Sequence, residues 1–163
     1  MSGSVNADEF GRIADEWIDK TVTKEFNTRL RKIGLGLFGL VSQASPVLTG
    51  RFRGSWDMEV GTYPSRPGLP EEGTGGSEAA ATQAAMRRAQ PALDQIKAAE
   101  RIVEFVGVAN PMAYGPALEY GVRTGRSSRS SGEVYRVGSQ KSGPGFVRAA
   151  VEAMRSRIRS GAI

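Results

Sequence analysis

The sequence predicts an α+β fold, in which a small, mainly antiparallel sheet packs against a long N-terminal helix and a C-terminal helix, with long flexible loops. Apolar residues recur every three or four positions over residues 7–44 and 144–159, which is the period of an amphipathic helix. Between these helices, residues 51–61 and 101–108 carry the apolar and β-branched residues typical of strands. With 163 residues the chain is long enough for one core, so we treat residues 1–163 as a single domain.

The N-terminal helix is predicted over residues 7–44. Asn6 suits its N-cap, and the helix should end at Ser45 because the following Pro46 disfavours helical geometry in the residue before it. Three β-branched residues at positions 21–23 crowd the backbone, so this is where the helix can break. The apolar stripe consists of Phe10, Ile13, Ala14, Trp17, Ile18, Val22, Phe26, Leu30, Ile33, Leu37 and Val41.

A corner and the first strand should follow. Thr49 and Gly50 predict the corner, because glycine adopts backbone angles that other residues resist. Residues 51–61 are predicted to form a strand, with apolar residues spaced in twos from Trp56 onward. Residues 62–76 are rich in glycine and proline and have no hydrophobic period, which predicts a flexible loop.

The middle of the chain predicts a second helix and a second strand. Ser77 is a suitable N-cap for an alanine-rich helix that ends near residue 99 and is broken or kinked at Pro91. The strand at residues 101–108 should be closed by the Asn110-Pro111 pair.

The last third predicts a short helix, a basic loop and the C-terminal helix. Residues 112–120 are expected to make one or two helical turns that stop at Gly121. Residues 122–143 are predicted to be a basic flexible loop, and the amphipathic helix over 144–159 completes the fold.

The composition argues against an enzyme or a metal protein. The chain has no cysteine and no histidine, so disulfides, the usual zinc ligands and the commonest general base are missing. We therefore expect no catalytic residue, no cofactor and no metal. We also expect no membrane contact, because the most apolar run, residues 33–41, is far shorter than the roughly 20 residues of a span. The N-terminus lacks the basic start and apolar core of a secretory signal.

Two patterns that resemble active sites have simpler explanations. Residues 34–39 read G-x-G-x-x-G, but no strand precedes them, so these small residues are expected to let another helix approach closely. Asp15, Glu16 and Asp19 are expected to form a solvated helix face, although a hydrolase with paired carboxylates is conceivable there. Glu119 lies between two apolar residues and needs a cationic or hydrogen-bonding partner, so we expect a structural role.

The predicted basic loop is a candidate contact surface. The net charge of +5, from 22 Lys and Arg against 17 Asp and Glu, favours nucleic acid or an acidic protein as partner. Because the loop contains one aromatic residue, Tyr135, sequence-specific nucleic-acid recognition is not expected. Docking on a partner protein is favoured over non-specific contact with DNA phosphates. The basic residues expected to make either contact are Arg123, Arg126, Arg129, Arg136 and Lys141.

Three short stretches, 49–56, 110–121 and 143–149, each combine turn residues with bulky apolar groups and one or two charges. The order of long helix, Thr-Gly corner, strand, Asn-Pro-x-x-Tyr…Leu-Glu-x-Gly segment, basic loop and Gly-x-x-Arg-Ala helix resembles the neck and tail-completion proteins of long-tailed bacteriophages. The resemblance runs from about Ser42 to Ile158. The residues expected to form structural corners are Thr49, Gly50, Trp56, Asn110, Tyr114, Glu119, Gly121, Gly145 and Phe146.

The resemblance implies a structural protein of the virion neck, assembled in the cytoplasm of the bacterial host. It implies a homo-oligomeric ring, six-fold in symmetry, through which DNA passes. Its neighbours would be a head connector or head-closure protein on one side and a tail terminator or tail-tube protein on the other. Two alternatives remain: a tail terminator or head-closure protein of the same particle, and a small non-enzymatic DNA-binding protein.

Overall fold

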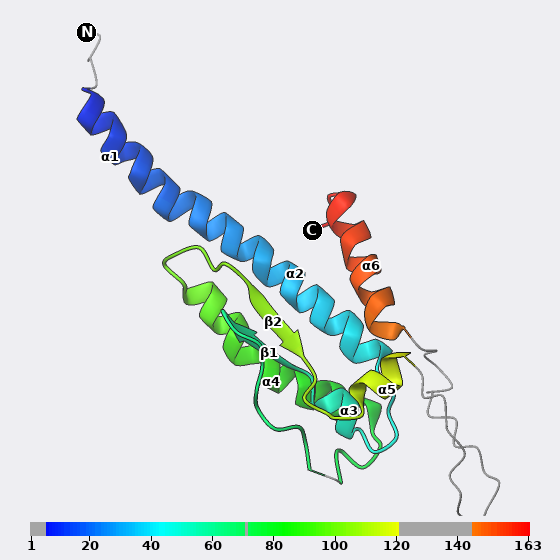
Figure 1. The fold of residues 1–163 in the computed structure, drawn as a ribbon. Coiled ribbons are helices and arrows are strands. Elements are labelled where there is room, and N and C mark those ends of the chain that lie inside the picture. Colours follow the sequence, from blue (N-terminus) through cyan, green and yellow to red (C-terminus); the bar gives the residue numbers. More distant parts are fainter. Residues whose placement is uncertain (1–5, 71, 121–144) are drawn as a thin grey trace, which may run out of the picture.

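A computed structural model describes residues 6–70, 72–120 and 145–163, and it confirms the α+β fold with a long N-terminal helix, a small antiparallel sheet and a C-terminal helix (Figure 1). Along the chain the elements are α1 (Ala7–Trp17), the π-helical segment η1 (Ile18–Val22), α2 (Thr23–Ala44), α3 (Arg51–Gly54), β1 (Asp57–Val60), α4 (Glu78–Ala98), β2 (Val106–Ala109), α5 (Gly115–Tyr120) and α6 (Phe146–Arg159).

The predicted N-terminal helix is confirmed as one long rod made of α1, η1 and α2. The Asn6 side chain accepts hydrogen bonds from the backbone N–H groups of Asp8 and Glu9, and so caps the rod. The rod does not break at the β-branched residues 21–23. Instead it widens to a π-helix in η1, a rare conformation that occurs mostly as a single turn inside an α-helix. It ends before Pro46, where Ser45 has extended backbone angles, as predicted.

The sheet is smaller than the sequence predicts. It contains β1 and β2 in antiparallel register, with Asp57 opposite Ala109 and Val60 opposite Val106. The predicted strand at 51–61 is wrong over its first half, because residues 51–54 form the helical turn α3. The predicted strand at 101–108 is wrong over 101–105, which the structure does not assign to a strand.

Segment 101–105, which is not part of a strand, is held mainly by the side chain of Asn27. The side-chain nitrogen of Asn27 in α2 donates to the carbonyl oxygen of Arg101 at 2.9 Å, and its oxygen accepts from the backbone N–H of Val103 at 2.9 Å. Just after β1, the backbone N–H of Gly61 donates to the carbonyl oxygen of Phe105 at 3.1 Å, but Gly61 has a φ of +71°, which is not a strand conformation. The ladder of β1 and β2 therefore does not continue along segment 101–105.

The second helix, α4, begins as predicted and contributes much of the core. Ser77 accepts a hydrogen bond from the backbone N–H of Ala80, and the helix continues through Pro91, where a break or kink was expected. Its buried face consists mainly of alanine, which lets it pack closely on β1, α3 and α2.

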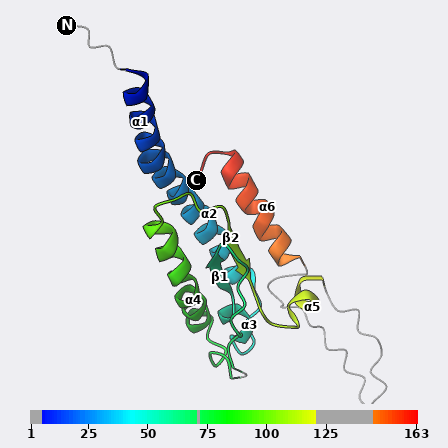
Figure 2. The ribbon, with the colours of Figure 1, turned by 60° about the vertical axis from the view of Figure 1, so that its left-hand side comes forward.

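The layers are arranged around α2. The sheet and α4 lie on one side of α2, and α6 lies on the other (Figures 1 and 2). The G-x-G-x-x-G motif lies inside α2, without the strand that a dinucleotide site requires. Gly36 faces Met154 of α6, which supports the expectation that small residues admit another helix. The buried apolar core is made of Phe38, Val41, Phe52, Trp56, Met58, Ala85, Ala89, Ala92, Leu93, Met112, Phe146 and Ala150.

We expect Gly107→Ala to destabilise the fold, because a Cβ at Gly107 would lie 2.9 Å from Cα of Tyr63 and still closer to the carbonyl oxygen of Thr62. These are backbone atoms, so relief requires moving the chain, which costs about 1–3 kcal/mol for typical overpacking. Gly39→Ala in α2 is the matched control, since its Cβ would meet nothing within 4 Å and alanine favours a helix by about 1 kcal/mol. Urea denaturation should separate the two variants, and equal midpoints would contradict this packing.

Candidate functional site

Two of the three motif stretches are joined by Asn110. Its side-chain nitrogen donates to the carbonyl oxygen of Phe52 in α3 at 2.8 Å. Its side-chain oxygen accepts from the backbone N–H of Met112 at 3.1 Å, which closes a tight turn over Pro111. The Asn-Pro corner is therefore fastened directly to the Thr-Gly corner, 58 residues away in sequence.

The Thr-Gly corner also holds the long loop. Gly50 has a φ of +79°, which glycine tolerates, and it directly precedes α3. The carbonyl oxygen of Thr49 accepts from the backbone N–H groups of Thr74 at 2.8 Å and Gly76 at 3.0 Å. Leu69 is held too, since its N–H donates to the Ser55 hydroxyl at 2.8 Å. The described part of loop 62–76 is thus more firmly attached than its composition predicts, because backbone hydrogen bonds replace apolar burial.

Four aromatic rings pack where the motifs meet. The ring of Phe52 is central, with centroids 6.1 Å from Trp56, 5.6 Å from Tyr114 and 6.1 Å from Phe146. Trp56 and Phe146 are both 5% exposed, whereas Tyr114 is 40% exposed. Trp56 and Phe146 therefore lie in the core, and Tyr114 lies at its edge. Partial burial raises the pKa of the Tyr114 hydroxyl, although the nearby charge of Arg51 lowers it.

Glu119 joins the third motif stretch to the second. One carboxylate oxygen accepts from the backbone N–H of Val147 at 2.9 Å, and the other accepts from that of Arg148 at 3.2 Å. The carbonyl oxygen of Glu119 accepts from the N–H of Gly145 at 2.6 Å. A carboxylate is favourable at a helix N-terminus, where backbone N–H groups lack partners. Glu119 therefore caps α6 from a distant part of the chain, which explains why the acid is needed.

Replacing Glu119 with alanine should lower the free energy of unfolding by about 0.5–2 kcal/mol, the usual cost of losing a helix cap. Glu152→Ala is a suitable comparison because it removes an acid from the exposed surface of the same helix. Thermal unfolding followed by circular dichroism would measure both. If Glu119→Ala melts like Glu152→Ala, Glu119 does not hold α6 in place.

Arg53 and Trp56 fix the corner to the end of α2. The guanidinium of Arg53 donates to the carbonyl oxygens of Gln43 at 2.9 Å and Ser45 at 2.8 Å. Cations are stabilising at a helix C-terminus, where carbonyl groups lack partners. The indole N–H of Trp56 donates to the Ser45 hydroxyl at 2.6 Å, which leaves this buried polar group satisfied.

A buried ion-pair cluster lies beside the corner, and no local sequence pattern indicates it. Asp57 is fully buried at the start of β1. Its carboxylate accepts from the guanidinium groups of Arg66 in the loop and Arg88 in α4, the latter at 2.9 Å. Arg88 also donates to the carbonyl oxygen of Pro67 at 2.9 Å. The cluster thus connects β1, the loop and α4. We infer a structural role from these partners.

The carboxylates considered for catalysis lie elsewhere. Glu16 on α1 is exposed and pairs with Lys20 at 2.6 Å and with Arg12 at 3.8 Å. The hydrogen bond and the charge of Lys20 lower the pKa of Glu16. Asp15 and Asp19 are exposed on the same rod, which agrees with the expected solvated face. Among the residues that the structure describes, no three His, Cys, Asp or Glu residues are grouped so that they could hold a metal ion.

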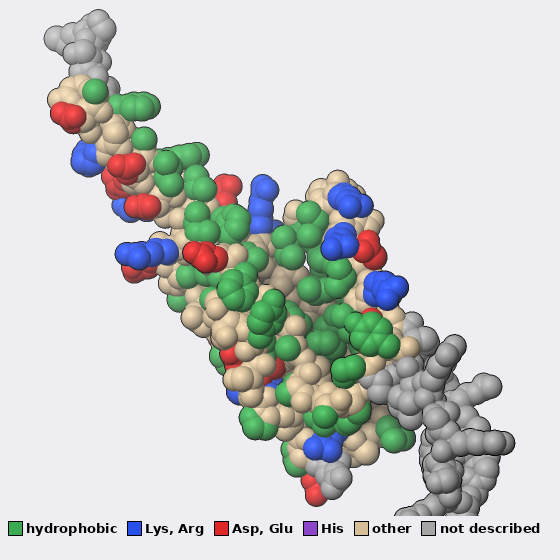
Figure 3. Space-filling model, in the orientation of Figure 1, with side chains coloured by type: hydrophobic (Ala, Val, Ile, Leu, Met, Phe, Trp, Pro, Cys, Tyr) green, Lys and Arg blue, Asp and Glu red, His purple; other side chains and the backbone are tan. Residues whose placement is uncertain are grey.

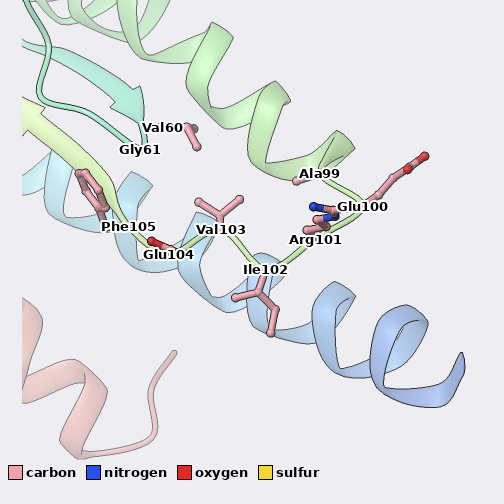
Figure 4. A pocket seen from close by; sticks show the side chains of 9 residues that line it. All are labelled: Val60, Gly61, Ala99, Glu100, Arg101, Ile102, Val103, Glu104 and Phe105. Atoms are coloured by element: carbon pink, nitrogen blue, oxygen red, sulfur yellow. The ribbon is translucent and has the colours of Figure 1, made fainter. Parts of the chain in front are cut away.

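An open groove between the end of β1 and segment 99–105 has no converging polar groups. It has a volume of about 560 Å³ and is lined by Val60, Gly61 and the segment 99–105 (Figure 4). Its charged side chains all belong to that one extended segment, and Glu100 points outward. A binding site for a small molecule usually adds polar groups aimed inward from several elements. We therefore assign no ligand to this groove.

Six of the predicted site residues lie outside the described residues. They are the predicted corner residue Gly121 and the five basic residues expected to contact a partner or DNA, Arg123, Arg126, Arg129, Arg136 and Lys141. Of the helices that the structure describes, none is long and apolar enough to cross a membrane. No family model, curated protein or solved structure matches this chain.

Proposed function

We propose that this chain is a structural protein of the neck of a long-tailed bacteriophage. In this proposal several copies, six by the resemblance, form a ring between the head connector or head-closure protein and the tail terminator or tail-tube protein. DNA passes through the ring, and the protein carries out no reaction. The virion neck would be its location.

One observation carries the proposal most directly. The three motif stretches on which the resemblance depends, far apart in sequence, meet in a single corner. Asn110 bonds to Phe52, Phe52 packs on Phe146, and Glu119 caps α6. If each motif stretch only formed its own local turn, contacts between the three stretches would not be expected. Their convergence builds a single docking scaffold, and this fits a protein that acts by presenting surfaces.

The corner also determines where the basic segment leaves the body. The backbone N–H of Gly145 donates to the carbonyl oxygen of Glu119 at 2.6 Å, so the described residues on either side of the basic segment lie together on the body. A partner protein could bind it there without disturbing the core, since ordering a charged segment on a partner is a common way to couple assembly with binding.

Inactivating the gene in the phage that encodes this chain tests the proposal. Electron micrographs of the lysate should show DNA-filled heads and separate tails, and supplying the wild-type protein from a plasmid should restore joined particles. Complete, infectious particles without the chain would contradict the proposal.

The same assay tests the basic segment. Replacing Arg123, Arg126 and Arg129 with glutamine should spare folding but prevent head–tail joining, while DNA affinity stays unchanged. Replacing the exposed Arg87 and Lys97 of α4 with glutamine removes two positive charges from another part of the surface and, as the control, should leave joining intact. If the triple variant instead loses salt-dependent DNA binding equally on all sequences, the segment contacts phosphates. A wild-type protein that strongly selects one DNA sequence would favour the alternative of a DNA-binding protein.

A further inference from the structure

The N-terminal end of the rod carries an apolar stripe that no other described element of the chain covers. α1 has no buried residue. Phe10 is 67% exposed and Trp17 is 59% exposed, and Ile13 and Ile18 are exposed beside them. Scattered apolar residues are common on protein surfaces, but a row of two large aromatic and two isoleucine side chains along one helix indicates a binding surface.

The described part of the chain does not fold back over this stripe. α1 continues into α2 through η1 without interruption, so its direction is set by the body of the molecule. Figures 1 and 2 both show α1 projecting beyond the sheet, α4 and α6. Whatever covers the stripe in the described fold must therefore come from outside it.

We propose that a second copy of this chain covers the stripe, and that α1 of one copy docks on α6 of the next. The proposal rests on the ring-forming part of the proposed function, and the two surfaces in contact would be α1 of one copy and α6 of its neighbour.

Charge complementarity identifies α6 as the docking partner. Residues 7–22 contain five carboxylates and two basic side chains, so this end of the rod is acidic. α6 contains four arginines and one carboxylate, that of Glu152, so it is basic. Opposite charges across an interface steer association and exclude wrong registers. α6 also offers an apolar contact, since Ile158 near its end is 45% exposed.

The spacing of charges on the two helices also matches. Glu9 and Glu16 are seven residues apart on α1, and Arg148 and Arg155 are seven residues apart on α6, so each pair is separated by about 10 Å along its helix. Figure 3 shows Lys and Arg side chains on α6 and hydrophobic side chains running from α1 towards α2 and α6 on the same face. An apolar stripe beside a row of acids can thus meet an apolar edge beside a row of arginines.

This contact joins two different surfaces. An interface of this kind adds copies head to tail, and it closes into a ring when the rotation between copies permits. The same chain thus supplies both halves of the contact, which is what a ring subunit requires.

Sedimentation velocity of the full chain over a range of concentrations tests the docking. Replacing Phe10 and Trp17 with serine should weaken self-association about tenfold or more, since buried aromatic residues dominate interface energies. Replacing Arg12 and Asp19 with serine is the control on the same rod, and it should weaken self-association far less. Because these side chains are exposed in the single chain, the melting temperature measured at concentrations where the wild type is monomeric should be nearly unchanged in both variants.

Charge reversal tests the choice of α6. Glu9→Lys with Glu16→Lys should weaken self-association, and so should Arg148→Glu with Arg155→Glu, whereas the combination of all four should restore it. A wild-type chain that stays monomeric at every concentration, or stripe variants that associate as the wild type does, would overturn the inference. Failure of the fourfold variant to recover would overturn the α1–α6 pairing.

The outcome can be separated from that of the proposed function. If the stripe variants still associate and still join heads to tails, the docking is wrong and the neck function stands. If the stripe drives association but phage particles form without the chain, the docking is right and the neck function is wrong.

Discussion

Asp57→Asn should lower the free energy of unfolding by about 3–5 kcal/mol, the cost of removing one partner from a buried ion pair. Asp57 is fully buried, and its two cationic partners differ in exposure. The side chain of Arg66 is 43% exposed and can turn to water, whereas that of Arg88 is only 16% exposed. The loss of the carboxylate charge therefore leaves Arg88 largely desolvated without a counter-charge. Asparagine keeps the shape of the side chain, so a cavity does not confuse the result.

The measurement is urea denaturation, with Glu152→Gln as the matched control. Glu152 pairs with Arg155 at 2.6 Å, but both side chains are more than half exposed, so the loss should be only about 0–1 kcal/mol. Similar losses for the two variants would show that the Asp57 cluster is not a buried structural element.

Phe146→Ala should cost about 3–5 kcal/mol, as large-to-small substitutions of buried aromatic residues do. Phe146 begins α6 and packs edge-on against Phe52 at 6.1 Å, so its loss opens a cavity where the motifs meet. Ile158→Ala in the same helix removes an exposed side chain and should change the free energy of unfolding by about 0.5 kcal/mol or less. Equal melting temperatures for Phe146→Ala and the wild type would rule out this placement.

Local signals predicted the elements whose causes are local. The long helix, the Ser77 cap, the short helix before residue 121 and the C-terminal helix all follow from period, caps and turn residues. The strand at 51–61 was predicted too long because Phe52 and Trp56 are four residues apart, a spacing that fits a helix as well as an alternating strand. A helical turn forms here instead of a strand because Gly50, in the left-handed conformation, turns the chain immediately before α3.

Long-range partners could not be read from the sequence. Glu119 was recognised as an acid that needs a partner, but the partner is a helix N-terminus 28 residues away. Asp57 and Arg88 are 31 residues apart, and nothing near either residue indicates the other. Segment 101–105 has strand-forming residues, yet Asn27 holds it because β1 has already ended. In each case, tertiary packing decides what local preference leaves open.

Cryo-electron microscopy of the purified particle would test the proposed ring in the phage neck. We expect a ring of copies at the junction of head and tail, with density that fits the α1–α2 rod and α6 around a channel wide enough for DNA. Purified particles that lack the chain, or that carry it away from the junction, would contradict this proposal.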